Sequence, residues 1–199
     1  MFSFLFFVVM IAVILFTITL HEYAHGKAAE LFGDPTPRLS GRLTLNPLAH
    51  IDPIGLLMLV VVRFGWAKPV PIDTRYFKDP EKDMAIVGFA GPLANFTVAV
   101  MISAVFRIVP LPQSEFGLFL SNIFQYAIWI NIALGIFNLL PVPPLDGSRI
   151  LRAILPYEGQ IFMDRMEPYG FFLLIFLIIF PGFSDVLFYI VNYFAGLLV

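Results

Sequence analysis

The chain has 199 residues, of which 59% are hydrophobic and only 13% are charged, whereas about 25% of the residues of soluble domains are charged. These proportions predict an integral membrane protein, and residues 1–199 suffice for a single membrane-embedded domain. The formal net charge of −2 excludes a strongly basic face and argues against a nucleic-acid partner, and the absence of cysteine excludes disulfides and thiolate metal ligands.

The first expected element is one long helix over residues 1–32. It is apolar over its first 20 residues, then becomes amphipathic, and stops at Gly33-Asp34-Pro35. No positively charged segment precedes the apolar run, and it leads into His21 instead of a small-residue cleavage site. We therefore expect it to be retained rather than removed as a secretory signal.

Residues 34–80 differ in kind, because proline and glycine interrupt them too often for one spanning helix. The segment Arg42-Leu43-Thr44-Leu45 alternates like a short strand, and the apolar run from Ile54 to Val62 is too short to cross a bilayer of about 30 Å as a helix. The pattern predicts a membrane-embedded, re-entrant hairpin containing short β-strands. Irregular backbone at membrane depth is tolerated beside an aqueous cavity, so we expect one there.

The rest of the chain predicts further helices, which gives an all-α integral membrane protein with a bundle of about four to five transmembrane helices. The C-terminal apolar segment is broken at Pro181-Gly182 and is compatible with one kinked span or with a tight helical hairpin. The expected elements are a second span at 84–109, a third span at 116–140, a polar loop and short amphipathic helix at 141–167, and the apolar segment at 169–199.

The positive side chains predict the orientation. If the first helix runs from outside to inside, only Arg107 of the 12 Lys and Arg falls outside, which leaves 11 on the cytoplasmic side. We therefore expect a multi-pass protein of the cell inner membrane, surrounded by the lipid bilayer, with its N-terminus outside.

The most informative motif is His21-Glu22-Tyr23-Ala24-His25, at the end of the apolar run. On a helix, His21 and His25 lie about 40° apart around the axis, so both imidazoles can bind one metal ion, and Glu22 lies beside the open position as a general base. At about 1.5 Å per residue, this site lies about 30 Å from the N-terminus, near the cytoplasmic face. Five residues can also match by chance, and the alternative is a solvated helix end.

A catalytic zinc ion needs a third protein ligand. Asp146 is favoured because prolines and Gly147 hold rigid backbone on both sides of it, although an N-cap of a helix over Ser148 to Leu155 explains the local sequence equally well. His50 is the main rival. The other candidates for the third ligand are the acidic residues in apolar surroundings, Asp52, Asp73 and Asp185.

Taken together, His21-Glu22-Tyr23-Ala24-His25 and the distant Leu145-Asp146-Gly147 resemble the two signature motifs of the site-2 protease family of intramembrane zinc metalloproteases. The resemblance covers about residues 20–155. Further segments resemble the small branch of the family, which lacks PDZ and CBS domains, and the connection after Val109 is too short for a PDZ domain. These segments are residues 41–53, 65–71 and 91–95.

The resemblance implies a zinc ion (Zn2+) bound by His21, His25 and Asp146, with Glu22 as the general base. It also implies an enzyme, a zinc-dependent endopeptidase that cuts single-span or other transmembrane protein substrates within or near the cytoplasmic side of the bilayer. Two alternatives stay open: a membrane metal transporter, and a catalytically silent protein that binds transmembrane helices.

The resemblance also implies roles for residues around the metal. Asn95 would lie near the ion and position the substrate or stabilise an oxyanion, and Asn138 would contact the substrate backbone. Residues 40–75 would form a hairpin that pairs with the extended substrate and gates the site, with His50 as a gating contact or a support for the ligands. The alternative for Asn95 is a hydrogen bond that joins helices, and we assign Asn131 to packing.

Overall fold

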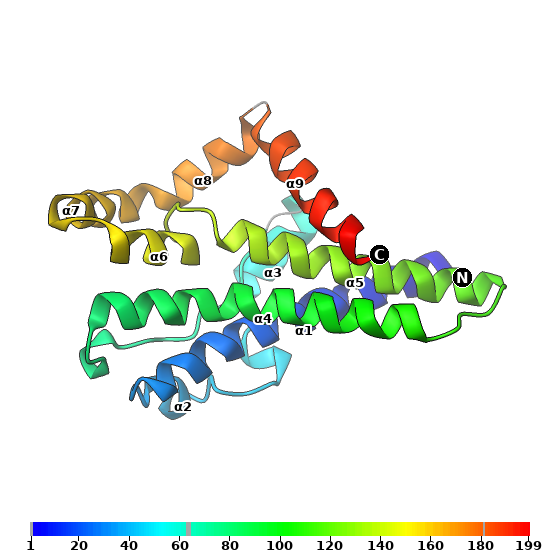
Figure 1. The fold of residues 1–199 in the computed structure, drawn as a ribbon, viewed down its shortest axis with the longest axis horizontal. Helices are drawn as coiled ribbons and strands as arrows, with labels where there is room; N and C mark the ends of the chain where they lie inside the picture. The colour runs from blue at the N-terminus through cyan, green and yellow to red at the C-terminus, as the bar shows by residue number, and fades with distance from the viewer. Residues whose placement is uncertain (1, 63–64, 181) are drawn as a thin grey trace.

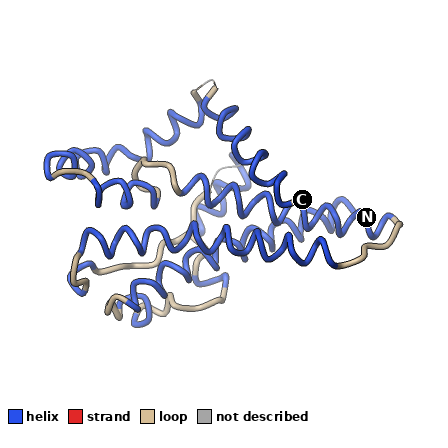
Figure 2. Tube along the Cα trace, viewed as in Figure 1, coloured by secondary structure: helices blue, strands red, loops and turns tan. Residues whose placement is uncertain are grey.

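The computed structural model describes residues 2–62, 65–180 and 182–199. These residues are mostly helical and contain no strand, as the tube in Figure 2 shows. Short 3-10 turns lie at Pro47–Ala49, Thr74–Tyr76 and Glu167–Tyr169. The α-helices are α1 (Phe2–Leu31), α2 (Thr36–Leu39), α3 (Pro53–Val62), α4 (Pro80–Ile108), α5 (Glu115–Asn138), α6 (Asp146–Ile154), α7 (Tyr157–Met166), α8 (Gly170–Ile179) and α9 (Phe183–Leu198).

Three of these helices, α1, α4 and α5, are long and apolar enough to cross a membrane. The helices that follow α6 form a pair bent by 81°, which counts as a fourth span if the pair is one broken span. The described residues thus hold three or four candidate spans, against the four to five expected, and the chain is a multi-pass membrane protein.

The long helices begin where the sequence supplies caps. Asp79 precedes α4, and its carboxylate accepts a hydrogen bond from the Lys82 N–H (3.3 Å). Ser114 precedes α5, and its hydroxyl accepts from the Gly117 N–H (3.3 Å). Each cap satisfies a backbone donor that the first turn leaves unpaired.

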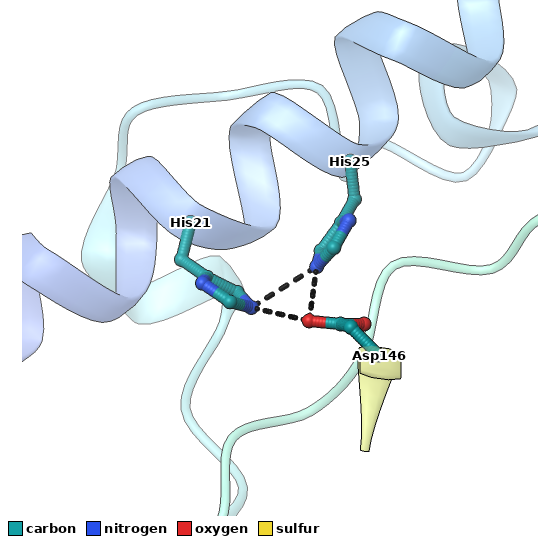
Figure 3. A group of neighbouring side chains, drawn as sticks. All are labelled: His21, His25 and Asp146. Atoms are coloured by element: carbon teal, nitrogen blue, oxygen red, sulfur yellow. Dashed lines mark hydrogen bonds and ion pairs between the residues drawn. The ribbon is translucent and has the colours of Figure 1, made fainter. Parts of the chain in front are cut away.

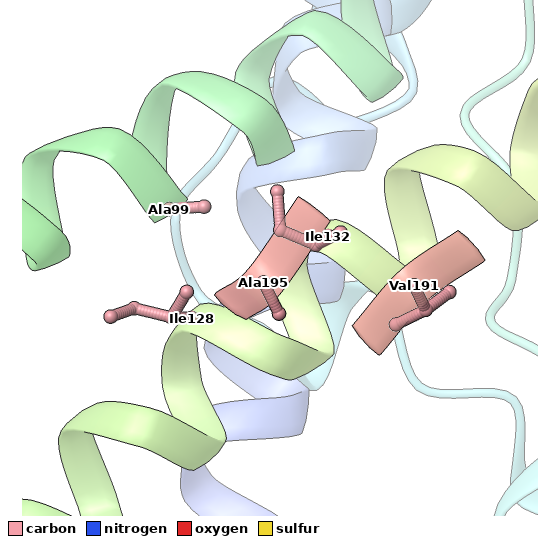
Figure 4. Packing of buried hydrophobic residues seen from close by; sticks show 5 residues of the cluster. All are labelled: Ala99, Ile128, Ile132, Val191 and Ala195. Carbon is pink, nitrogen blue, oxygen red and sulfur yellow. The ribbon is translucent and has the colours of Figure 1, made fainter. Parts of the chain in front are cut away.

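The spanning helices pack around α4, which contacts α1, α5 and α6 (Figure 1). Helix α1 also contacts α5, so the first and third spans are neighbours. A buried apolar cluster lies where α4, α5 and α9 meet (Figure 4), and it consists of Ala99, Ile128, Ile132, Val191 and Ala195. Both chain ends lie at the end of the bundle opposite to α6 and α7 (Figure 1).

The segment before α4 differs from the expected hairpin with strands. The apolar run from Ile54 becomes part of the helix α3, and Arg42 to Leu45 form no strand. An isolated antiparallel bridge joins Ile51 to Ala67, next to a hydrogen bond from the Lys68 N–H to the His50 carbonyl (2.9 Å). Four alternating residues specify a strand only when a second strand lies alongside, and the described residues provide none there.

The C-terminal segment forms an arch made of α8 and α9 (Figure 1). The expected break at Pro181-Gly182 lies only partly within the described residues, because Pro181 lies outside them. Gly182 precedes α9 with φ of 89°, a left-handed conformation that glycine adopts without steric cost. The two helices are therefore separated by a sharp turn.

Candidate metal centre

Three ligand-type side chains meet beside α1 (Figure 3). His21 and His25 lie one turn apart on α1, and Asp146 is the first residue of α6. All three are buried. Asp146 Oδ2 lies 3.1 Å from the Nε2 atom of each histidine, and the two Nε2 atoms lie 3.0 Å apart.

The outer nitrogens of both imidazoles have hydrogen-bond acceptors. His25 Nδ1 lies 2.7 Å from the Val87 carbonyl oxygen, and His21 Nδ1 lies 2.5 Å from Asn95 Oδ1. A carbonyl only accepts, so in each ring Nδ1 carries the proton and Nε2 carries a lone pair.

Both Nε2 atoms and one Asp146 oxygen can therefore present lone pairs to a cation at their centre. Tetrahedral zinc with Zn–N bonds of about 2.0–2.1 Å separates its ligand atoms by roughly 3.3 Å. The observed separations of 3.0–3.1 Å fit that ion closely.

Two glycines allow the chain to approach this centre. A Cβ atom at Gly91 of α4 would lie 2.4 Å from His25 Nε2 and 2.7 Å from His21 Cε1. A Cβ atom at Gly147 would lie 2.2 Å from the Leu139 carbonyl oxygen, at the end of α5. Only glycine allows α4 to pass directly beside the imidazoles and α6 to begin against α5.

The structure rules out one of the two explanations of Asp146. The N-cap position of α6 is Leu145, and no side chain caps that helix. The Asp146 carboxylate instead points away from its own helix toward α1 (Figure 3). The N-cap alternative is therefore wrong.

Glu22 contacts a segment far away in the sequence. Its Oε2 accepts a hydrogen bond from the Val70 N–H (3.0 Å). Val70 lies between Pro69 and Pro71, neither of which has an N–H, and its side chain lies close to Gly26 of α1. This contact could not be predicted from the sequence, because a backbone amide is present at nearly every position.

The remaining candidates lie away from the three ligand atoms. His50 is 2% exposed and donates through Nε2 to the Thr44 carbonyl (2.9 Å), while its Nδ1 has no partner among the described residues. Asn138 ends α5 and donates to the Leu134 carbonyl (3.0 Å).

Asn95 lies behind the ring of His21 instead of facing the open side of the centre. Its Oδ1 contacts His21, and its Nδ2 donates to Asn131 Oδ1 (3.2 Å). Because both ends of the Asn95 amide already have partners, this geometry favours a role in orienting the ligand His21 over the expected contact with an oxyanion. Asn131, which we assigned to packing, belongs to the same group of contacts.

A cavity of about 560 Å³ lies beside the part of α1 that precedes the metal ligands. Its walls come from α1, α5, α8, α9 and the segments 47–55 and 65–67, and it begins at Ile18, about one turn before His21. The walls are mostly apolar, with polar groups at His50, Asp52 and Ser184. The cavity can therefore admit an apolar chain segment close to the metal centre.

Comparison with known proteins agrees with this geometry. Residues 107–181 match the profile of peptidase family M50. The chain is 37% identical to "Putative zinc metalloprotease YwhC" of Bacillus subtilis, over 92% of this chain and 85% of that protein. It is 32% identical to "Putative zinc metalloprotease Rip2" of Mycolicibacterium smegmatis, over 94% of this chain and 73% of that protein.

A shorter segment of 30 residues is 60% identical to "Regulator of sigma-W protease RasP" of Bacillus subtilis. This match covers 15% of this chain and 7% of that protein. No solved structure matches. Fold and site define a multi-pass membrane protein with two histidines and one aspartate around a metal position. The chain belongs to peptidase family M50, the site-2 protease family of zinc metalloproteases.

Proposed function

We propose that this chain is a zinc-dependent intramembrane endopeptidase that cuts transmembrane proteins within or near the cytoplasmic side of the bilayer. The observation that carries the proposal is the meeting of three lone-pair donors, from His21, His25 and Asp146, beside Glu22 on a membrane-spanning helix. A buried cluster of this kind is costly in a membrane and is retained for function.

Each residue has a part in peptide hydrolysis. The two histidines and Asp146 would hold the zinc ion, which would supply a bound water molecule with a pKa of about 7 and would polarise the scissile carbonyl. Glu22 accepts a proton from the attacking water and later donates it to the leaving amine. The Val70 N–H holds one oxygen of Glu22, which leaves Oε1 to accept the proton.

The substrate is a single-span or other transmembrane protein that must unwind before it is cut, because a helical carbonyl is already hydrogen-bonded. The cavity beside α1 supports this proposal, since apolar walls suit membrane-embedded residues. Residues 40–75 would pair with the extended substrate and gate the site, Asn138 would contact the substrate backbone, and His50 would contact the chain inside the cavity.

The proposed orientation places the N-terminus outside the cell inner membrane and the metal centre toward the cytoplasm. Positive residues support it. Arg107 lies in the last turn of α4 and donates to the Leu197 carbonyl near the C-terminal end of the chain (3.0 Å). Arg38 belongs to α2 and Arg152 to α6, and these two helices lie toward the opposite end of the bundle (Figure 1). Arg63, one of the 11 residues assigned to the cytoplasm, lies outside the described residues.

The test compares wild type with Glu22→Gln in liposomes that contain a single-span substrate, and it measures bound zinc and cleavage together. We expect Glu22→Gln to keep the zinc and to lose cleavage. Glu30→Gln is the matched control, because Glu30 lies two turns further along α1 and pairs with Lys27 and Arg38. Undiminished cleavage by Glu22→Gln, or zinc transport into the liposomes without cleavage, would overturn the proposal.

A further inference from the structure

Four buried polar side chains form a continuous row across three spanning helices. Thr17 and His21 lie one turn apart on α1, Asn95 lies on α4, and Asn131 lies on α5. Their exposed fractions are between 1% and 5%. The contacts run from His21 Nδ1 to Asn95 Oδ1 (2.5 Å), from Asn95 Nδ2 to Asn131 Oδ1 (3.2 Å), and from Asn131 Nδ2 to Thr17 Oγ1 (3.1 Å).

The direction of every hydrogen bond in this row follows from one backbone atom. Asn131 Nδ2 also lies 2.8 Å from the carbonyl oxygen of Ala127, which can only accept. The NH2 end of Asn131 must therefore face Ala127, and its Oδ1 must face Asn95. That oxygen requires a donor, so Asn95 turns its NH2 end toward Asn131 and its Oδ1 toward His21.

His21 is then limited to one tautomer. Facing the oxygen of Asn95, its Nδ1 carries the proton, and its Nε2 presents a lone pair to the metal position. If the Asn95 amide turned over, its NH2 would face His21 and favour a proton on Nε2, where it would exclude the ion. We propose that Asn131 is a positioning residue that acts through Asn95 to hold zinc ligand His21 ready for the metal.

The second histidine shows why two side chains are needed. His25 Nδ1 donates directly to the Val87 carbonyl, which belongs to the backbone of α4 and has no alternative orientation. Asn95 can present either end to His21, so its orientation has to be set by a further group. Thr17 adds a second acceptor for Asn131 but is not needed for the direction, because Ala127 already sets it.

A purely structural role would look different in an experiment. Asparagines between spanning helices often serve only to join them, and removing such a contact lowers stability without affecting a distant ligand. The inference, which rests on the proposed zinc site, instead predicts a loss of zinc affinity that depends on the asymmetry of the amide at position 95. A carboxylate there accepts through both oxygens and needs no orienting neighbour.

The experiment measures the zinc dissociation constant of the purified full chain in detergent by competition with a chromophoric chelator, together with the melting temperature. We expect Asn131→Leu to weaken zinc binding by about 10–100-fold, as the loss of a group supporting a metal ligand does. Asn131→Ala removes the same amide and is used if leucine prevents folding. Thr17→Val should change the affinity by less than about threefold, because the Ala127 carbonyl remains.

Two further comparisons complete the design. Asn192→Leu breaks a hydrogen bond between α9 and α5, in which the Trp129 indole N–H donates to Asn192 (2.8 Å), and should leave zinc affinity unchanged. Adding Asn131→Leu to Asn95→Asp should cause no further loss of affinity.

An equal loss in both backgrounds would overturn the inference and indicate packing alone, as would unchanged affinity in Asn131→Leu. Failure of wild type to bind zinc would overturn the proposed zinc site itself, so the two failures are distinguishable.

Discussion

Two regions that adjoin α1 are built in opposite ways: the metal side around His21 and His25, and the cavity side that begins at Ile18. On the metal side, Gly91 brings α4 into contact with the imidazoles, and the amide of Asn95 is bonded at both ends. On the cavity side, the walls come from irregular backbone and from the bent pair α8–α9 around an open volume of about 560 Å³. One side is closely packed and the other leaves space.

The difference corresponds to the two tasks of an intramembrane protease. A zinc ion requires ligand atoms held to within a few tenths of an ångström, so polar groups there are paired and side chains are small. A substrate segment requires room and unused hydrogen-bonding capacity, and His50 Nδ1 has no partner among the described residues. Substitutions on the two sides should therefore fail differently, by losing the metal on one and by losing substrate on the other.

The largest effect is expected for Asp146→Ala on the metal side. Losing an anionic ligand removes several kcal/mol of stabilisation of the metal site, so bound zinc should fall to near zero and cleavage by about 10³-fold or more. Zinc content per chain and initial cleavage rates measure both. Full zinc content in this variant would show that Asp146 is not a ligand.

Gly91→Ala tests the close approach of α4. The added methyl group would lie within 2.4–2.7 Å of atoms of both imidazoles, and such overpacking costs about 1–3 kcal/mol. Zinc affinity should fall by about 10–100-fold. Gly196→Ala on α9 is the matched control, because no atom lies within 4 Å of the added Cβ, and it should keep zinc affinity and raise stability slightly. Equal zinc affinity in the two variants would contradict the close-packed view of the metal side.

The sequence predicted the metal ligands better than the groups that orient these ligands. A His-Glu-x-x-His motif places two ligands on one helical face, and prolines and glycine around Asp146 indicate a rigidly held carboxylate. The local sequence explained Asp146 equally well as an N-cap, and only the resemblance to the protease family implied that it is the third ligand. The Val87 carbonyl that orients His25 could not be predicted, because every residue has a carbonyl and only the packing of α4 on α1 selects this one. Asn131 was visible as an amide in an apolar helix, but its neighbour Asn95 is 36 positions away.

The cavity side was less predictable for a related reason. Residues 42–45 alternate in polarity, which is a necessary condition for a strand, but pairing depends on a partner that the local pattern does not specify. The apolar residues from Ile54 onward satisfy their backbone hydrogen bonds as the helix α3 instead.

Ala133→Phe tests the cavity side by filling it. Ala133 of α5 lines the cavity, and a phenyl ring there would occupy space that the substrate needs. We expect kcat/KM to fall by about 5–100-fold, corresponding to about 1–3 kcal/mol of overpacking, with zinc content unchanged. Ala104→Phe adds the same bulk at an exposed position of α4 and should have no effect. Loss of zinc from Ala133→Phe would show that the two sides are not independent.

The smallest and most specific effect is expected at His50. Because its Nε2 donates to the Thr44 carbonyl, Nδ1 is the atom left with a lone pair. His50→Gln can keep a donor near the Nε2 position and lacks the acceptor at Nδ1, whereas His50→Asn keeps an acceptor near Nδ1 and loses the bond to Thr44. One neutral hydrogen bond contributes about 0.5–1.5 kcal/mol. His50→Gln should therefore lower kcat/KM by about 2–10-fold at unchanged stability. His50→Asn should lower mainly the melting temperature. Both variants should keep their zinc, and loss of zinc from either would make His50 a part of the metal side.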